Sequence, residues 1–197
     1  CKADNKKNIE ELVVESVAKG KIVSGKVAIL TRTNEEALNR TYSPEGKVEV
    51  SYEVTPELKE NDERTVKVEY YLVNGENEQK VEETPVNAGT YKVKVILEET
   101  AHYKGSTDEA NFTITKADYD MSQVIFEDGT FTYDGTEKRI EVSDNLPKGV
   151  SVTYENNDKI EPGEYEVTAK FEVQDKSNYN TPKSKSAKLV INKIETG

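Results

Sequence analysis

Hydrophobic and polar residues alternate with a period of two along several stretches of this chain. Successive side chains of a β-strand point to opposite faces, so the alternation predicts strands that bury one face. In the C-terminal half the apolar positions are Val150, Val152 and Tyr154, then Tyr165, Val167, Ala169, Phe171 and Val173, then Ala187, Leu189 and Ile191. In the N-terminal half they are Val48, Val50, Tyr52 and Val54, then Val66, Val68 and Tyr70, then Tyr91, Val93, Val95 and Leu97, then Phe112 and Ile114. This pattern predicts an all-β protein.

The first 40 residues carry a less regular pattern. Residues 10–17 fit either a strand or a short helix, because their apolar positions follow helical spacing while Val13 and Val14 favour β-structure. Residues 21–31 alternate around Gly25 and predict a strand with a bend. That strand either opens the first module or ends a preceding one.

The chain contains an internal repeat, marked by three landmarks that recur in the same order. The pairs are Thr41-Tyr42-Ser43-Pro44-Glu45-Gly46 with Thr132-Tyr133-Asp134-Gly135, Gly89-Thr90-Tyr91 with Gly163-Glu164-Tyr165, and Phe112-Thr113-Ile114-Thr115-Lys116 with Leu189-Val190-Ile191-Asn192-Lys193. The paired landmarks lie 91, 74 and 77 residues apart, so the first repeat has an insertion before its Gly-x-Tyr segment. In the second repeat, Asp134-Gly135 is a hairpin turn signal.

The repeat predicts two tandem modules. We expect residues 1–20 to be an N-terminal tether or partial strand, and residues 21–117 to form a first module with an enlarged middle. Residues 118–197 form the second module, and a short linker without glycine or serine joins the two.

Each Gly-x-Tyr segment stands just before the longest predicted strand of its repeat. Gly89 and Gly163 allow a tight corner, with positive φ as one way to make it. Tyr91 and Tyr165 then begin the strand, where a phenol packs its ring and returns its hydroxyl to the backbone. We therefore expect these four residues to be structural.

This segment resembles the tyrosine corner of immunoglobulin-like sandwiches, in which a cysteine stands two residues after the tyrosine. Val93 and Val167 occupy that place here, so no disulfide joins the sheets and the core depends on aliphatic packing. The resemblance implies two tandem immunoglobulin-like β-sandwich modules.

Residues 124–193 also resemble the bacterial immunoglobulin-like repeats called MBG or YDG domains. The resemblance rests on Thr132-Tyr133-Asp134-Gly135-Thr136-Glu137-Lys138, the Pro162–Tyr165 corner, Ser177-Asn178-Tyr179 and the closing Leu189–Lys193. The first repeat matches less fully, because Ser43-Pro44-Glu45-Gly46 replaces the Tyr-Asp-Gly turn. The family implies repeats of cell-surface or secreted proteins that act in adhesion or in spacing other domains, and it implies no catalytic residue.

The net charge and the apolar content limit the classes of partner that this chain is expected to bind. The 27 basic and 38 acidic residues give a net charge of -11, which disfavours binding to nucleic acid and favours a soluble monomer. No apolar run approaches the length of a membrane span, so we expect no membrane insertion by the fold itself. The expected partners are other domains of the same polypeptide, a glycan or a host surface protein.

The only cysteine is Cys1, which excludes an internal disulfide and a multi-cysteine metal site. A bacterial lipoprotein begins at a lipid-bearing cysteine followed by a polar tether, which Cys1 and residues 2–7 match. The alternative is that Cys1 marks only the boundary of an excised segment. In the first case the protein is extracellular and anchored to the cell surface through Cys1.

The sequence offers little catalytic chemistry. His102 is the only histidine, so a nucleophilic triad has a single candidate base and a histidine or cysteine metal site has too few ligands. Acidic and amide residues cluster at Asn61-Asp62-Glu63, at Asn156-Asn157-Asp158 and around Asp118 and Asp120, where turns explain them better than calcium. We predict a non-catalytic structural or adhesion repeat without a cofactor. The alternative is a module that binds a glycan or host protein through end loops such as 74–79 and 155–159.

Overall fold

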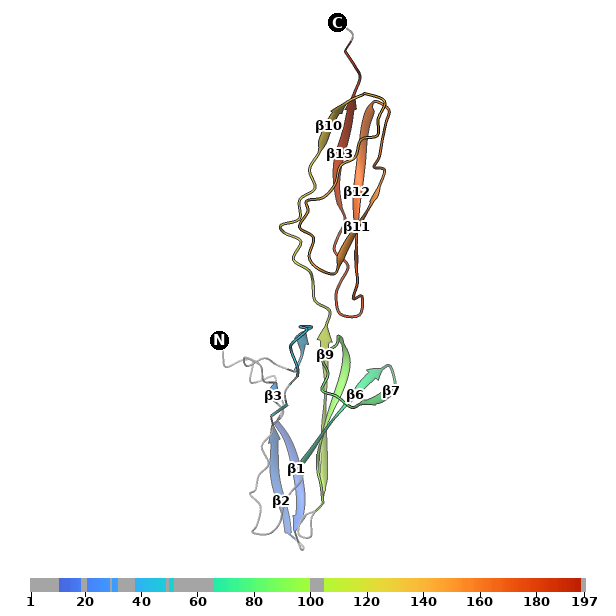
Figure 1. Ribbon diagram of the computed structural model, residues 1–197. Helices are drawn as coiled ribbons and strands as arrows, with labels where there is room; N and C mark the ends of the chain where they lie inside the picture. The colour runs from blue at the N-terminus through green and yellow to red at the C-terminus, as the bar shows by residue number, and fades with distance from the viewer. Residues whose placement is uncertain are drawn as a thin grey trace. The chain divides into compact units, whose positions relative to one another are not determined.

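A computed structural model describes residues 11–18, 21–28, 30–31, 38–48, 50–51, 66–99 and 105–195. The chain divides into two compact units, Cys1–Lys116 and Ala117–Gly197. The regular secondary structure in the described segments consists of strands, which confirms the all-β prediction (Figure 1). Within the same segments, no helix has the length and hydrophobicity needed to span a membrane.

The first unit begins with β1 (Glu11–Ala18), which pairs antiparallel with β2 (Lys21–Ala28). A strand is therefore the correct one of the two alternatives for the described part of this stretch, residues 11–17. β3 (Leu30–Thr31) pairs with β5 (Val50–Ser51). The main sheet has five strands in the order β4-β9-β8-β6-β7: β4 (Arg40–Thr41), β9 (Ser106–Thr115), β8 (Gly89–Leu97), β6 (Val66–Asn74) and β7 (Asn77–Val81).

The predicted alternation appears most clearly in β8. Tyr91, Val93, Val95 and Leu97 are all buried, and the residues between them are more exposed. They pack with Val48, Tyr70, Phe112 and Ile114 in the core of this unit. Burial of such aliphatic side chains contributes about 1.5–3 kcal/mol each and is the main reason that the strands hold this register.

The second unit has a four-stranded sheet in the order β10-β13-β12-β11. Its strands are β10 (Gly129–Thr132), β13 (Lys185–Asn192), β12 (Gly163–Val173) and β11 (Val150–Glu155). The buried side chains of β12 are Val167, Ala169, Phe171 and Val173, as the alternation predicts. Ala187, Leu189 and Ile191 of β13 are buried beside them.

The opening strand of each main sheet pairs in parallel with the last strand. Arg40 lies opposite Ile114 in the first unit, and Phe131 lies opposite Ile191 in the second. Each opening strand is followed by a tyrosine amide that donates to the last strand: Tyr42 N to Thr115 O at 2.7 Å, and Tyr133 N to Asn192 O at 2.8 Å. The repeat seen in the sequence is therefore also a repeat of pairing register.

The hairpin predicted at Asp134-Gly135 is wrong, because the strand before this turn does not pair with the chain that follows it. The turn exists, with Gly135 at φ 80°, but the chain that follows it does not return along β10. β10 pairs with β13, which begins some 50 residues later. Residues 139–142, which alternate in the sequence, form no strand of this sheet.

The insertion in the first repeat contains a hairpin. β6 extends to Asn74 and returns as β7, which pairs with β6 from Tyr70 to Asn74. In the second unit β11 ends at Glu155, and β11 is an edge strand of its sheet. The enlarged middle of the first repeat thus adds a fifth strand beside β6.

Candidate functional site

The two Gly-x-Tyr corners have the same geometry. Tyr91 Oη donates a hydrogen bond to Asn87 O at 2.8 Å, and Tyr165 Oη donates to Glu161 O at 2.8 Å. Each acceptor lies four residues before its tyrosine, so the phenol closes the loop that leads into the long strand. The sequence indicates a hydroxyl directed to the backbone, but it does not identify the acceptor.

The corner glycines are required by close approach. The backbone conformation also favours glycine, because the φ angles, 159° at Gly89 and 158° at Gly163, are positive values that other residues rarely adopt. A Cβ at Gly163 would lie 3.2 Å from Cζ and Oη of Tyr165, and one at Gly89 would lie 3.3 Å from Tyr91 Cε2. The tyrosine ring therefore lies across its own glycine, which leaves little room for a side chain.

The corner tyrosines are suited to packing. Tyr91 stacks on Phe112 with ring centroids 5.5 Å apart, and burial raises the pKa of its phenol. Tyr165 lies under the ammonium group of Lys159, with Nζ 5.3 Å from the ring centroid. A phenol with a raised pKa stays neutral at physiological pH, so the Tyr91 hydroxyl keeps the proton that it donates to Asn87 O.

The Asp134 turn is stabilised by its own side chains. Asp134 Oδ1 accepts hydrogen bonds from the amide and hydroxyl of Thr136, and Lys138 Nζ donates to Asp134 Oδ2 at 2.7 Å. The Lys138 bond, followed by those from Thr136, holds the pKa of Asp134 well below its usual range. These contacts explain the Tyr-Asp-Gly-Thr-x-Lys pattern as a turn that orders its own backbone.

The loop 155–159, a predicted binding loop, is tied to the module. Asn157 Nδ2 donates to Ile140 O at 2.7 Å and its Oδ1 accepts from Ile140 N at 3.1 Å. Asn156 Nδ2 donates to Glu166 O at 3.0 Å, and Lys159 exchanges two backbone hydrogen bonds with Lys138. Nothing in the sequence marked Asn157 apart from its neighbours in this polar loop.

The other predicted binding loop, 74–79, is the β6–β7 turn. Gly75 has a φ of 65°, a left-handed conformation that glycine adopts without strain. Residues 74–79 are exposed. Beside the turn, Lys92 Nζ contacts Glu78 Oε1 at 2.5 Å and Glu109 Oε1 at 3.5 Å. This charged side-chain network lies on the outer face of the sheet.

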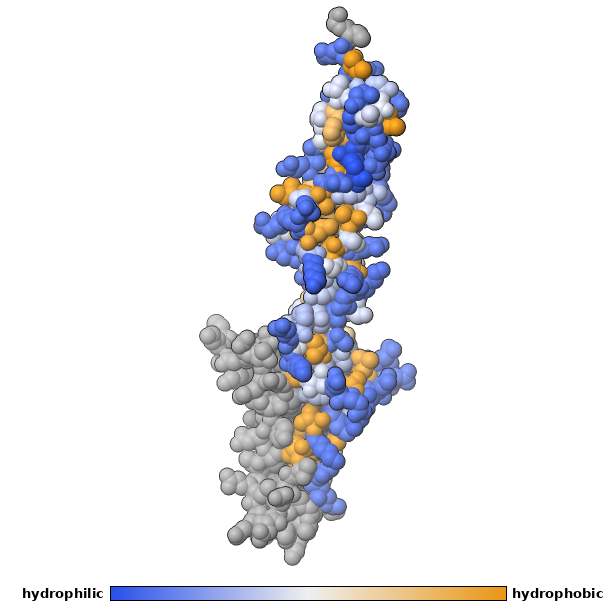
Figure 2. Space-filling view, viewed as in Figure 1, coloured by the Kyte–Doolittle hydropathy of each residue, from blue (hydrophilic) through white to orange (hydrophobic). Residues whose placement is uncertain are grey.

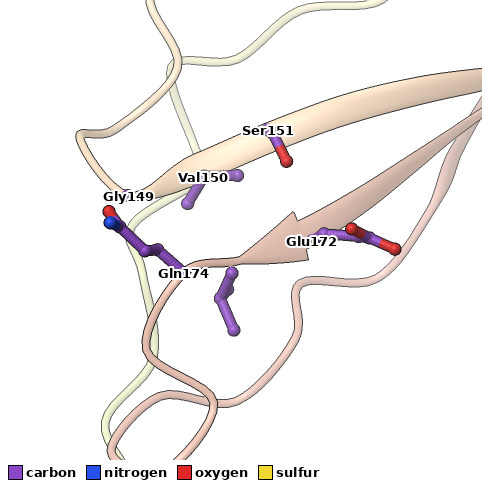
Figure 3. A pocket seen from close by; sticks show the side chains of 6 residues that line it. Gly149, Val150, Ser151, Glu172 and Gln174 are labelled. Atoms are coloured by element: carbon purple, nitrogen blue, oxygen red, sulfur yellow. The ribbon is translucent and has the colours of Figure 1, made fainter.

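A hollow of about 460 Å³ lies between the start of β11 and the end of β12 (Figure 3). It is lined by Gly149, Val150, Ser151, Glu172, Val173 and Gln174. Ser151 and Glu172 are cross-strand partners, and both side chains are exposed. The lining offers a hydroxyl, a carboxylate and an amide for hydrogen bonding, and it contains no imidazole or thiol.

The acidic clusters in the described segments have polypeptide partners. Asp118 Oδ1 accepts from Asn180 Nδ2 at 2.9 Å, Asp120 Oδ1 accepts from the amide of Ser122 at 3.0 Å, and Asp158 lies 3.4 Å from Arg139. No group of three or more histidine, cysteine or acidic residues suited to a metal occurs among the described residues. Cys1, His102 and the cluster at 61–63 lie outside the described residues.

The coloured part of the visible face is mainly hydrophilic, with hydrophobic residues gathered in the middle part of the second unit and smaller groups on the first unit (Figure 2). Within the part of the chain that the structure describes, the exposed large hydrophobic residues are Leu72, Ile125, Ile160 and Ile194. They come from four separate segments of the chain.

Comparison with known families gives one match on the first unit. Residues 59–118 match the model of the MBG domain, which confirms the resemblance to an MBG-type repeat and indicates a surface-associated repeat domain. The match spans β6 to β9, including the Gly89–Tyr91 corner. It lies in the first repeat, whose sequence contains fewer of the MBG or YDG motifs than the second. Neither the curated proteins nor the solved structures provide a match.

Proposed function

We propose that this chain is a non-catalytic structural repeat of a bacterial surface or secreted protein, which spaces or presents other domains. It consists of two tandem immunoglobulin-like β-sandwich modules. The observation that carries the proposal is the strand arrangement common to both units: an opening strand parallel to the last, then the corner strand, then β6 or β11. The MBG match on residues 59–118 supports the surface location.

The second unit supports the sandwich assignment through a second layer of extended chain. Ser143 N donates to Ile125 O at 2.8 Å, and Lys138 pairs with Lys159. Ile140 from this layer packs on Val167, Ala187 and Leu189 of the sheet, and Val124 packs on Ala169 and Phe171. Side chains from two layers thus share one core, as in a sandwich.

Several features favour a structural role over ligand binding. The loop 155–159 uses Asn156 and Asn157 to hold its own module. The geometry shared by the two corners directs Tyr91 and Tyr165 to backbone carbonyls, so both hydroxyls are hydrogen-bonded. The repeated parts of the two units are therefore parts that stabilise a fold.

A binding survey of the purified chain tests the proposal. A structural repeat should give no saturable signal on a glycan array or on a panel of host surface proteins. Saturable binding that is lost in Asp158→Ala, or in Glu76→Ala on the β6–β7 turn, would instead support a ligand-binding module. Labelling of intact cells with an antibody to the chain tests the surface location, which requires labelling without permeabilisation.

A further inference from the structure

The second unit has its chain ends at opposite ends of the β10–β13 pair. Ala117 exchanges backbone hydrogen bonds with Asn178 and Asn180, in the connection that precedes β13. The chain leaves the unit after Asn192, where β13 ends. Figure 1 shows β10 and β13 as parallel arrows that both point toward the C-terminal end of this unit.

This arrangement determines how tension reaches the sheet. A pull on the ends of the unit first loads the segment before β10, which is held by the Ala117 bonds and by the bond from Ser143 N to Ile125 O. Once that segment is released, the pull draws β10 from Gly129, its first residue, and β13 from Asn192, its last. Because the strands are parallel, these two pulls act in opposite directions along the strand axis. The hydrogen bonds between the strands lie across that axis and are loaded together, whereas a peeled strand loses them one after another.

We propose that the β10–β13 pair is a mechanical clamp that allows the second unit to carry tension between its ends. The pair spans Gly129–Thr132 opposite Leu189–Asn192. Bonds beyond both ends extend it, with Tyr133 N donating to Asn192 O at 2.8 Å and Lys188 N donating to Asp128 Oδ1 at 2.7 Å.

The core holds the clamp in register. Leu189 is 0% exposed and Ile191 is 2% exposed, so sliding of β13 would withdraw both side chains from the core. Phe131 of β10 packs against the same cluster as Leu189. Rupture of the clamp therefore requires breaking backbone hydrogen bonds and exposing apolar surface in a single step.

The first unit has a shorter version of the clamp. β4 pairs with β9 at two positions, Arg40 and Thr41, compared with four positions in the second unit. Tyr42 N adds one bond to Thr115 O, and Thr113 N donates to Asn39 Oδ1 at 2.7 Å. The structure therefore assigns the greater resistance to the second unit. This load-bearing property goes beyond the proposed spacing role and does not depend on whether the chain binds a ligand.

Single-molecule stretching of the full chain by its two ends tests the clamp. The length of chain released identifies each unit, because the units comprise Cys1–Lys116 and Ala117–Gly197. Tyr133→Pro removes the amide that donates to Asn192, while Tyr133→Ala removes the same side chain and keeps that amide. We expect the second unit to unfold at clearly lower force in Tyr133→Pro than in Tyr133→Ala.

A change of pulling direction provides a test without loss of hydrogen bonds. In a Cys1→Ser, Glu164→Cys chain, a handle at position 164 and one at the C-terminus pull β13 away from β12, one bond after another. Glu164 is exposed and lies opposite Val190. The clamp requires a rupture force severalfold lower in this direction than when the chain is pulled by its two ends. Equal forces in the two directions, or equal forces for the two Tyr133 variants, would overturn the proposal.

Discussion

The side-chain amide of Asn157 hydrogen-bonds both backbone polar groups of Ile140, a residue 17 positions earlier in the chain. Its Oδ1 accepts from Ile140 N, and its Nδ2 donates to Ile140 O. Ile140 is 7% exposed and is the side chain through which the second layer packs on Val167 and Leu189. A polar loop residue therefore fixes the position of a core residue. Side-chain amides substitute here for a strand partner, since residues 139–142 form no regular strand.

Asn157→Ala should destabilise the second unit. Removal of the amide leaves the N–H and C=O of Ile140 without these partners, which costs about 1–3 kcal/mol. Urea denaturation, with amide hydrogen exchange to report on the second unit, measures the loss. Asn192→Ala, at an exposed position of β13, is the control and should change stability by less than about 0.5 kcal/mol. A urea denaturation midpoint of Asn157→Ala equal to that of the parent chain would contradict the structural role of this loop.

The two corner hydroxyls should differ in their contribution to stability. Tyr91→Phe removes a part-buried hydrogen bond to Asn87 O and should cost about 1 kcal/mol. Tyr165→Phe removes the equivalent bond to Glu161 O at an exposed position, where water can replace the phenol, so its cost should be smaller. Denaturation midpoints of the two variants give the comparison. An equal or larger loss in Tyr165→Phe would show that exposure does not decide the contribution.

The close approach of Gly163 to Tyr165 predicts coupling between the two positions. Gly163→Ala places a methyl group 3.2 Å from the Tyr165 ring, so it should destabilise the second unit by roughly 1–2 kcal/mol. In a Tyr165→Ala background the ring is gone, so the same substitution should cost less and only the strain of the positive φ at Gly163 should remain. A double-mutant cycle measures this difference, and additive losses would mean that backbone conformation, not the ring, requires the glycine.

Strand positions could be predicted from the sequence wherever one face is fully buried. β8 and β12 follow the apolar alternation because a slip of one residue would expose every core side chain. The place of the corners was also visible, since a glycine and an aromatic residue recur at the same spacing in both repeats. These signals are local, so a single sequence contains them.

Pairing partners and side-chain tethers could not be predicted in the same way. Asp134-Gly135 has the composition of a hairpin turn, yet β10 finds its partner in β13, because the pairing of an opening strand depends on the whole sheet. The bond from Asn157 to Ile140 joins positions 17 residues apart, and neighbouring asparagines in the loop look equivalent. Long-range packing decides both features, and the local sequence does not encode it.

Tyr70 predicts a loss of stability of the first unit at alkaline pH. It is 9% exposed, and burial raises the pKa of its phenol to about 12, against about 10 for an ordinary tyrosine. Between these values the unfolded chain releases the proton while the folded chain retains it. The stabilisation is therefore complete below about pH 10 and falls as pH rises toward about 12, by about 3 kcal/mol in total.

Tyr70→Phe should remove this contribution, because phenylalanine has no proton to release and keeps the edge contact with Phe112. Denaturation midpoints measured from pH 8 to pH 12 should fall less steeply for this variant than for the parent chain. Lys67, Lys80 and Lys92 also have raised pKa values, through hydrogen bonds to Glu98, Glu69 and Glu78. Their contribution is common to both proteins and cancels in the comparison. Tyr71→Phe is the matched control, since its hydroxyl donates to Glu69 on the other face of β6 and should alter the slope less. Parallel slopes for Tyr70→Phe and the parent would show that the buried phenol does not control alkaline unfolding.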